Sequence, residues 1–447
     1  MEASSRNLGS AAPRPGDCTP DEHRLHRRLF LKGLAASGAA TVTSFGGLFT
    51  NPLFAQATQR AQKNVLLLWL CGAPSQFETW DPKPGRPTSG PFASVPTSIP
   101  GIHFSSLMPR CASIAHEMNV IRCMHTKQSE HLQGINLLTR GNPDRAGFTR
   151  PTLGSAVSAA LDRIDTALPR FILLDPNPEG NEFKEYKASD LAGWLGPDHA
   201  PVRLGGSYTQ LGSAADALAD DRDAREALRR FFSHKYENER GSRVAGMQNA
   251  AFEKVKGLMA SADLFDVAKL PEKDRARYGP GTVGLHTLMA RELVGKGAPF
   301  VMVANGMPWD NHVFQHEIHQ MLVPELDRIL HCLITDLKER GLLEHTLVIA
   351  MGEFGRTPWL NPARGRDHYP NAWSLMMTGC GLKRGVVVGG TDRDGVDPDG
   401  RSFNEQNLFA TIFTALGIDP YAEYDLPGMP TFHRVEDRAE PIKEVLA

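Results

Sequence analysis

Six short apolar runs, separated by helical stretches, constrain the fold of this chain more than any other feature. Residues 65–70 read Val-Leu-Leu-Leu-Trp-Leu, a continuous apolar run that is typical of a strand covered on both faces. Similar runs occur at 119–121, 171–174, 300–303, 346–351 and 374–377. The alternation predicts an α/β fold with a mainly parallel, doubly wound sheet and helices on both of its faces.

Helical periodicity lies between these runs. A helix is expected at 283–294, and a second one ends near Gly341, where a glycine would close it. The second helix carries one apolar stripe, formed by Leu326, Ile329, Leu330, Leu333, Ile334 and Leu337.

Two segments depart from the alternation. Residues 72–104 are rich in Pro, Gly and Ser and predict an ordered loop over the sheet edge. Residues 211–277 are charged and predict a helical insertion, with a pair of helices at 214–240 and 244–259. This insertion is either a cap beside the functional site or a plain surface excursion.

The N-terminal segment has the features of a secretory leader. Arg27 and Arg28 precede Phe-Leu-Lys and a weakly apolar stretch at 33–49, and Ala55 and Ala57 supply the small residues of a cleavage site. The paired arginines resemble the twin-arginine class of signals, which implies export of a folded protein to the periplasm or cell surface. The alternative is an uncleaved anchor, but glycine, serine and threonine interrupt the apolar stretch. We therefore expect a twin-arginine signal peptide at 1–57 and one domain at 58–447.

The composition excludes several classes of protein. The chain has 447 residues, 41% of them hydrophobic, which is enough for one large α/β domain or two smaller ones. A formal net charge of −2 argues against a nucleic-acid binder. The six cysteines form no CxxC pair, and without Cys18 an odd number remains, so disulfides are not expected to be the main support of the fold. No segment beyond the leader is long and apolar enough to cross a membrane.

Ligands of an open parallel sheet bind beyond the carboxyl ends of its strands, so the residues that follow each run are the candidates for a site. Ser75 follows the first run, and its hydroxyl is either a catalytic group or a helix-cap or turn residue. His125 and His131 follow the second run, with Thr126 and Ser129 between them. One of these two hydroxyls is a candidate nucleophile if a metal lowers its pKa; the alternative is a polar loop.

Asp310 and His312 follow the run at 300–303. In an extended segment, side chains two apart point the same way, as two ligands of one ion would. His316 could join them only if a helix has already begun there. The alternative is a helix entry that Asp310 or Asn311 caps.

Two later segments add further charged groups. Glu353 ends a buried strand and predicts a metal ligand, unless it pairs with Arg356. His368 can ligate a metal while Asp367 accepts its other ring proton or ligates the metal itself. Arg366 suits a pair of phosphate or sulfate oxygens; the alternative is a loop ion pair with Asp367.

These clusters together predict a metal-assisted displacement on an anionic ester. Imidazole and carboxylate ligands favour Zn, Mn or Fe over Ca or Mg. The candidate metal ligands are Asp310, His312, Glu353, Asp367, His368, His125 and His131. The candidate catalytic residues are Ser75, Thr126, Ser129, Arg356 and Arg366.

The motifs in this order resemble the exported bacterial proteins of domain-of-unknown-function family 1501, from Asn64 to about Ile442. They read Gly-Ala-Pro-Ser-Gln at 72–76, Trp-Asp-Pro-Lys-Pro at 80–84, Trp-Asp-Asn-His at 309–312, Met-Gly-Glu-Phe-Gly-Arg-Thr-Pro at 351–358, Gly-Arg-Asp-His-Tyr-Pro at 365–370 and Leu-Gly-Ile-Asp-Pro at 416–420. The resemblance implies the fold of the alkaline phosphatase and sulfatase-like superfamily.

The resemblance also implies roles for single residues. Asp310 and His312 match an Asp and His that bind one metal, and His368 matches the final His of the superfamily. Glu353 occupies the position of a ligating Asp, but Phe354 follows where a second ligand is usual. Residues 72–75 lack the Asp that normally ends the first strand.

Three functions follow as expectations. The first is a metal-dependent hydrolase of sulfate or phosphate esters, with a sulfated polysaccharide as one candidate substrate. The second is a non-catalytic binding or scaffold protein on the same fold, since fold does not fix function. The third is a phosphomutase-like transferase, which needs a hydroxyl that can be phosphorylated in the site.

Overall fold

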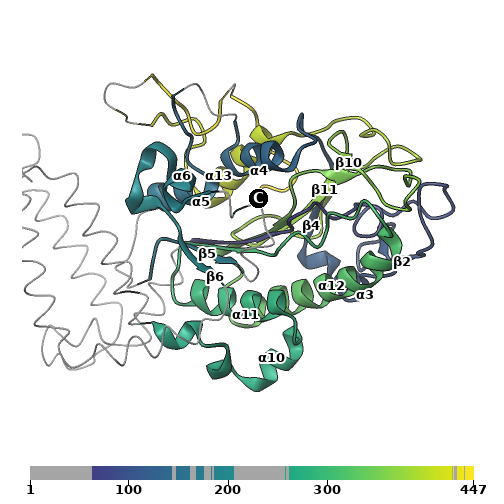
Figure 1. The fold of residues 1–447 in the computed structure, drawn as a ribbon, viewed down its shortest axis with the longest axis horizontal. Coiled ribbons are helices and arrows are strands. Elements are labelled where there is room, and N and C mark those ends of the chain that lie inside the picture. Colours follow the sequence, from purple (N-terminus) through teal and green to yellow (C-terminus); the bar gives the residue numbers. More distant parts are fainter. Residues whose placement is uncertain are drawn as a thin grey trace, which may run out of the picture. The chain divides into compact units, whose positions relative to one another are not determined.

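The fold is seen in a computed structural model (Figure 1). It describes residues 63–447 except 143–146, 162–167, 176–182, 184–185, 206–256, 258–260, 425, 427–429 and 437. The predicted leader lies outside the described residues, and so does the predicted pair of helices at 214–240 and 244–259 apart from Gly257.

An eight-stranded sheet forms the centre of the described domain, with the strand order β12-β4-β11-β8-β1-β7-β5-β6. Every strand is parallel to its neighbours except β11, which runs antiparallel to β4 and β8. The strands are β1 (Asn64–Trp69), β4 (Asn119–Met124), β5 (Phe171–Asp175), β6 (Val202–Gly205), β7 (Phe300–Ala304), β8 (Thr346–Met351), β11 (Trp373–Thr378) and β12 (Val387–Val388). All six predicted apolar runs are strands, and the predicted mainly parallel sheet is confirmed.

Helices cover both faces of this sheet (Figure 1). One face carries α4 (His131–Arg140), α5 (Leu153–Ala160), α6 (Ala188–Ala192) and α13 (Glu405–Leu416), and the other carries α3 (Pro109–Ser113), α10 (Glu272–Tyr278), α11 (Thr282–Gly295) and α12 (Gln315–Glu339). The described 3-10 helices are η1 (Ala115–Glu117), η4 (Gly193–Leu195), η5 (Pro197–His199), η6 (Ala262–Phe265) and η7 (Val267–Lys269).

The two faces explain why the strands are apolar throughout. Side chains alternate along a strand, so Val65, Leu67 and Trp69 of β1 enter the core under α4, α5 and α13. Leu66 and Leu68 enter the opposite core under α3, α11 and α12. The predicted doubly wound arrangement is therefore confirmed.

The two predicted helices are also present. α11 includes residues 283–294, and all six residues of the predicted stripe on α12 are buried in the core. Gly341 has φ +66° just after α12, the left-handed conformation that a helix end favours. None of the helices in the described part of the chain is long and apolar enough to span a membrane.

Residues 72–104 form the predicted ordered loop, with a short antiparallel pair of β2 (Ser94–Pro96) and β3 (His103–Ser105). A second short pair joins β9 (Gly355–Arg356) to β10 (His368–Tyr369). The five cysteines in the described residues, at 71, 111, 123, 332 and 380, are buried thiols, and no disulfide joins any two of them.

Candidate metal centre

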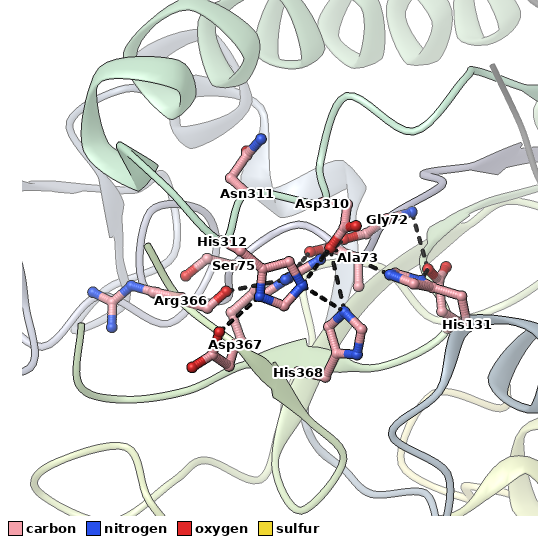
Figure 2. Close-up of polar contacts among 12 residues, drawn as sticks. Gly72, Ala73, Ser75, His131, Asp310, Asn311, His312, Arg366, Asp367 and His368 are labelled. Carbon is pink, nitrogen blue, oxygen red and sulfur yellow. Dashed lines mark hydrogen bonds and ion pairs between the residues drawn. The ribbon is translucent and has the colours of Figure 1, made fainter. Parts of the chain in front are cut away.

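Four of the predicted ligands meet at the carboxyl edge of the sheet (Figure 2). His131 begins α4 just after β4, and Asp310 and His312 lie in the connection between β7 and α12. His368 lies in β10, in the connection that leaves β8 and enters β11. Because β11 is antiparallel to β8, this connection starts and ends at the same edge. The sheet topology thus brings together residues that are far apart in the sequence.

Oδ1 of Asp310 is the common point of the cluster. Three Nε2 atoms surround this oxygen, at distances of 3.2 Å for His131, 3.0 Å for His312 and 3.2 Å for His368. The Nε2 atoms of His312 and His368 are 3.0 Å apart, so they cannot both carry a proton, and at least one presents a lone pair. Ligand atoms of His131, Asp310 and His368 all lie within 4.8 Å of one another, which is close enough to share one metal ion.

Each imidazole of the cluster is held by its other nitrogen. Carboxylate and carbonyl oxygens only accept hydrogen bonds, so Nδ1 is the donor in every pair. The pairs are His131 with Oε1 of Glu353 (2.7 Å), His312 with Oδ1 of Asp367 (2.7 Å) and His368 with the carbonyl oxygen of Ser129 (2.5 Å). Such bonds fix the tautomer and direct the Nε2 lone pair at the centre.

Glu353 and Asp367 therefore lie one layer outside the point where the four ligand candidates meet. Glu353 is fully buried, and its Oε1 also accepts the N–H of Gly72 at 2.9 Å. The sequence left open whether Asp367 accepts a ring proton or ligates the metal itself. It accepts a ring proton, but from His312 and not from the adjacent His368. The alternative ion pair of Glu353 with Arg356 is not formed, because Arg356 pairs with Asp310.

Arg356 is buried beneath the cluster. Its Nη2 donates to Oδ1 of Asp310 at 2.7 Å and to the carbonyl of Gly72, and its Nε donates to the carbonyl of Ala73 at 3.0 Å. Burial raises the pKa of Asp310, but its contacts with His131, His368 and Arg356 hold that pKa well below its usual range. Asp310 is therefore a carboxylate, and Arg356 positions it.

Gly72 fits the cluster because it has no side chain. Its φ is +91°, and a Cβ atom there would lie 2.5 Å from the backbone nitrogen of Asp310. The backbone of residue 72 thus approaches Asp310 closely while its N–H holds Glu353. The glycine at position 72 is explained by this approach of one backbone to another.

Arg366 is engaged elsewhere. Its guanidinium donates twice to Oε1 of Glu78, at 2.9 and 3.2 Å, and its remaining N–H groups donate to carbonyl oxygens of Thr88, Thr357 and Pro358. Burial raises the pKa of Glu78, but the Arg366 charge and a hydrogen bond with His316 lower it well below its usual range. The alternative pair of Arg366 with Asp367 is not formed, and no N–H of Arg366 is left for a substrate anion.

The candidate hydroxyls and His125 lie outside the cluster. The Ser75 hydroxyl is buried and accepts the N–H of Phe77 at 3.3 Å, which fits the turn role left open for it. Thr126 is buried and donates to the carbonyl of Gln128 at 3.4 Å, and Ser129 reaches His368 through its backbone carbonyl. Nδ1 of His125 is buried without a hydrogen-bond partner among the described residues.

The sequence reasoning missed a buried group behind the cluster, formed by Glu78, Gln315 and His319. α12 begins at Gln315, so His316 lies inside the helix and faces Glu78, with Nε2 3.5 Å from Oε1. His319 is fully buried, and its Nε2 accepts the N–H of Ser75 at 3.3 Å. Glu78 lies in a buried segment, but Gln315 and His319 alternate with more exposed residues at the start of α12, so the sequence alone gives little sign of this group.

His319 makes the stability of the domain depend on pH. Burial lowers its pKa from 6.5 to about 4, so the unfolded chain binds a proton there before the folded chain does. Its contribution to stability is complete above pH 6.5 and is lost as the pH falls toward 4. By about pH 4.5 the loss is about 2–3 kcal/mol.

Substitution His319→Gln, which keeps an acceptor for Ser75, removes this pH dependence. We expect the free energy of unfolding to fall less between pH 7 and about pH 4.5 in the variant than in the parent, as measured by chemical denaturation. Equal losses in the two proteins would contradict the prediction. The comparison therefore reports the proton uptake of His319 together with its charge interaction with Glu78.

The family of proteins of unknown function DUF1501 matches residues 62–446 of the sequence. The chain belongs to this family. The resemblance inferred from the sequence motifs is thereby confirmed. A comparison with curated proteins gives no significant match.

Several solved structures are similar to the chain. A sulfatase from Pseudoalteromonas sp. is 15% identical, with 81% of this chain and 69% of that chain covered and a TM-score of 0.37. A protein in the alkaline phosphatase superfamily from Vibrio parahaemolyticus is 12% identical (86% and 71% covered, TM-score 0.38). A phosphonate monoester hydrolase of Agrobacterium radiobacter is also 12% identical (81% and 75% covered, TM-score 0.38). At these sequence identities and TM-scores, none of these activities is assigned to this chain.

Proposed function

We propose that the chain is an exported hydrolase of sulfate or phosphate esters that uses one divalent metal ion. The ion is held by His131, Asp310 and His368, with His312 as a fourth ligand. The observation that supports this most is the convergence of three Nε2 atoms on one carboxylate oxygen while every Nδ1 is held by an acceptor.

The residues fit a transition metal. Three imidazole nitrogens and one carboxylate oxygen suit Zn, Mn or Fe better than Ca or Mg. Glu353 and Asp367 are the outer carboxylates that commonly hold metal-binding imidazoles. A divalent ion supplies Lewis acidity there, which activates water and stabilises charge on a leaving oxygen.

The side chains restrict how an ester is attacked and bound. Ser75 and Thr126 are buried outside the cluster, and Ser129 contacts His368 through its carbonyl oxygen and not its hydroxyl, so we propose water as the nucleophile. Arg356 and Arg366 donate to protein oxygens, so recognition of the substrate anion depends on the metal ion and not on a free arginine fork. Asp310 is the one carboxylate among the proposed ligands. A divalent ion there would keep a net positive charge, which favours an anionic group on the substrate.

Metal content tests this proposal. We expect about one Zn, Mn or Fe ion per chain in the purified mature protein by elemental analysis, and little in a His312→Ala, His368→Ala double variant. His125→Ala is the matched control, because His125 lies in the connection from β4 to α4 but outside the cluster, and this variant should keep its metal. Protein without metal, or with equal metal in the parent and the double variant, would exclude the proposed centre.

A panel of aryl sulfates and aryl phosphates then tests hydrolysis. Turnover that disappears in the double variant and persists in His125→Ala supports the hydrolase. Bound metal without turnover of any ester would favour the second expected function, a non-catalytic binding or scaffold protein that carries the same ion.

We also propose export by the twin-arginine machinery to the periplasm or cell surface, supported by the sequence of residues 1–57. Substitution Arg27→Lys, Arg28→Lys keeps both charges but removes the paired arginines. We expect the full-length variant to accumulate inside the cell, whereas the parent is recovered from the periplasmic or surface fraction. Unchanged fractionation of the variant on immunoblots would reject this route.

A further inference from the structure

A hollow lies on the α11 and α12 side of the sheet, apart from the metal cluster. It is a cavity of about 460 Å³ at the carboxyl ends of β1 and β7. The turn Asn305–Trp309, the start of α11 and the middle of α12 form its walls. None of the four cluster residues lines it. Open α/β sheets bind ligands at this edge, and the volume is that of a site for a small organic molecule.

The walls of the cavity are largely apolar. Leu70, Val283, Leu322, Leu326 and Ile329 line it from β1, α11 and α12. Leucine and isoleucine side chains give an organic ligand an environment that removes apolar surface from water. They offer no hydrogen bonds, so the polar groups of the wall determine which ligand is preferred.

Glu325 is the one ionisable side chain that lines the cavity. It forms no ion pair with a described residue. Its Oε1 lies close to Gly281, the residue just before α11, because a Cβ atom built on Gly281 would lie 2.0 Å from this oxygen. The positive end of the helix dipole stabilises a carboxylate there without neutralising it. The wall of the cavity thus carries a negative charge that lacks a cationic partner in the described part of the chain.

Trp309 adds an aromatic wall. The residue is 2% exposed, and its Nε1 has no hydrogen-bond partner among the described residues. Trp309 lines the cavity beside the leucines and adds to its apolar wall. A lone carboxylate on the wall of an apolar cavity selects a positively charged group on an apolar body.

We infer that this cavity binds a small organic cation, with its ammonium group at Glu325 and its apolar body among the leucines. The carboxylate repels an anion of the same shape, so the site discriminates by charge. The inference does not depend on the proposed hydrolase, because the cavity and the metal cluster share no residue.

The probe is 4-phenylbutylammonium, and 4-phenylbutanoate is its matched anion. Calorimetric titration of the parent protein should detect binding of the cation at least tenfold tighter than binding of the anion. Equal binding of both ions, or no binding of the cation, would overturn the inference, and this comparison requires no variant.

Three variants locate the site. Glu325→Gln should weaken binding of the cation at least tenfold, and Leu322→Trp, which fills the cavity, should abolish it. Glu339→Gln is the control, because Glu339 is an exposed residue of the same helix. Circular dichroism confirms that each variant is folded. Unchanged affinity in folded Glu325→Gln would place the cation elsewhere and reject the inference.

Discussion

Replacement of Arg366 by methionine is expected to lower the free energy of unfolding by about 3–5 kcal/mol. The Arg366 and Glu78 side chains are 1% and 0% exposed, and Nη2 lies 2.9 Å from Oε1. Methionine retains much of the volume of arginine but leaves the Glu78 carboxylate buried without its cation. It also removes the donors to the carbonyl oxygens of Thr88, Thr357 and Pro358. Chemical denaturation at pH 7 measures the loss.

Arg364→Met is the matched control for this variant. Arg364 is two residues away, but it is exposed and its pair with Glu317 lies at the surface, so the cost should be below about 1 kcal/mol. A double variant, Glu78→Gln with Arg366→Met, should regain part of the lost stability because no buried charge is left alone. Equal costs for Arg366→Met and Arg364→Met would show that the buried pair contributes nothing.

Substitution Asp310→Asn is expected to have the largest effect on metal binding. The asparagine keeps the shape of the side chain but removes the one negative charge at the point where three imidazoles meet. It also takes the ionic partner from Arg356, which is fully buried and would repel a cation. We expect the affinity for Zn to fall well beyond the roughly 10- to 100-fold loss that follows removal of an outer partner.

Asp367→Asn is the comparison for Asp310→Asn, since both remove one carboxylate. Asp367 contacts the Nδ1 atom of His312 and not the centre, so its loss should weaken metal binding by about 10- to 100-fold. Competition with a chromophoric chelator gives both affinities on one scale. If Asp367→Asn weakens binding as much as Asp310→Asn, the assignment of inner and outer carboxylates is wrong.

The sequence predicted the strands well because the sheet is covered on both faces. β1 and β8 are buried along their whole lengths, so each appears as an unbroken apolar run. β6 and β12 were missed because they lie at the sheet edges, where burial is partial. The antiparallel direction of β11 could not be read either, since an apolar run has the same composition in both directions.

The sequence located the site but did not give the role of each residue in it. Residues after the strands converge, yet which group faces the centre depends on packing between distant segments. α4 approaches β8 closely because Gly134 has no side chain, and a Cβ there would lie 3.2 Å from Cβ of Glu353. This approach brings Nδ1 of His131 to Glu353. Similarly, Glu78 and Arg366 are 288 residues apart, and neither sequence position reveals the other.

The antiparallel direction of β11 affects the conformational entropy that is lost when an ion binds. The connection of residues 352–372 is tethered at both ends to neighbouring strands, and its β9 and β10 segments pair with each other. Asp367 and His368 therefore lose their conformational freedom when the chain folds, well before any ion arrives. The entropy of ordering these two residues is therefore lost on folding and not on ion binding, which favours a high affinity of the proposed centre.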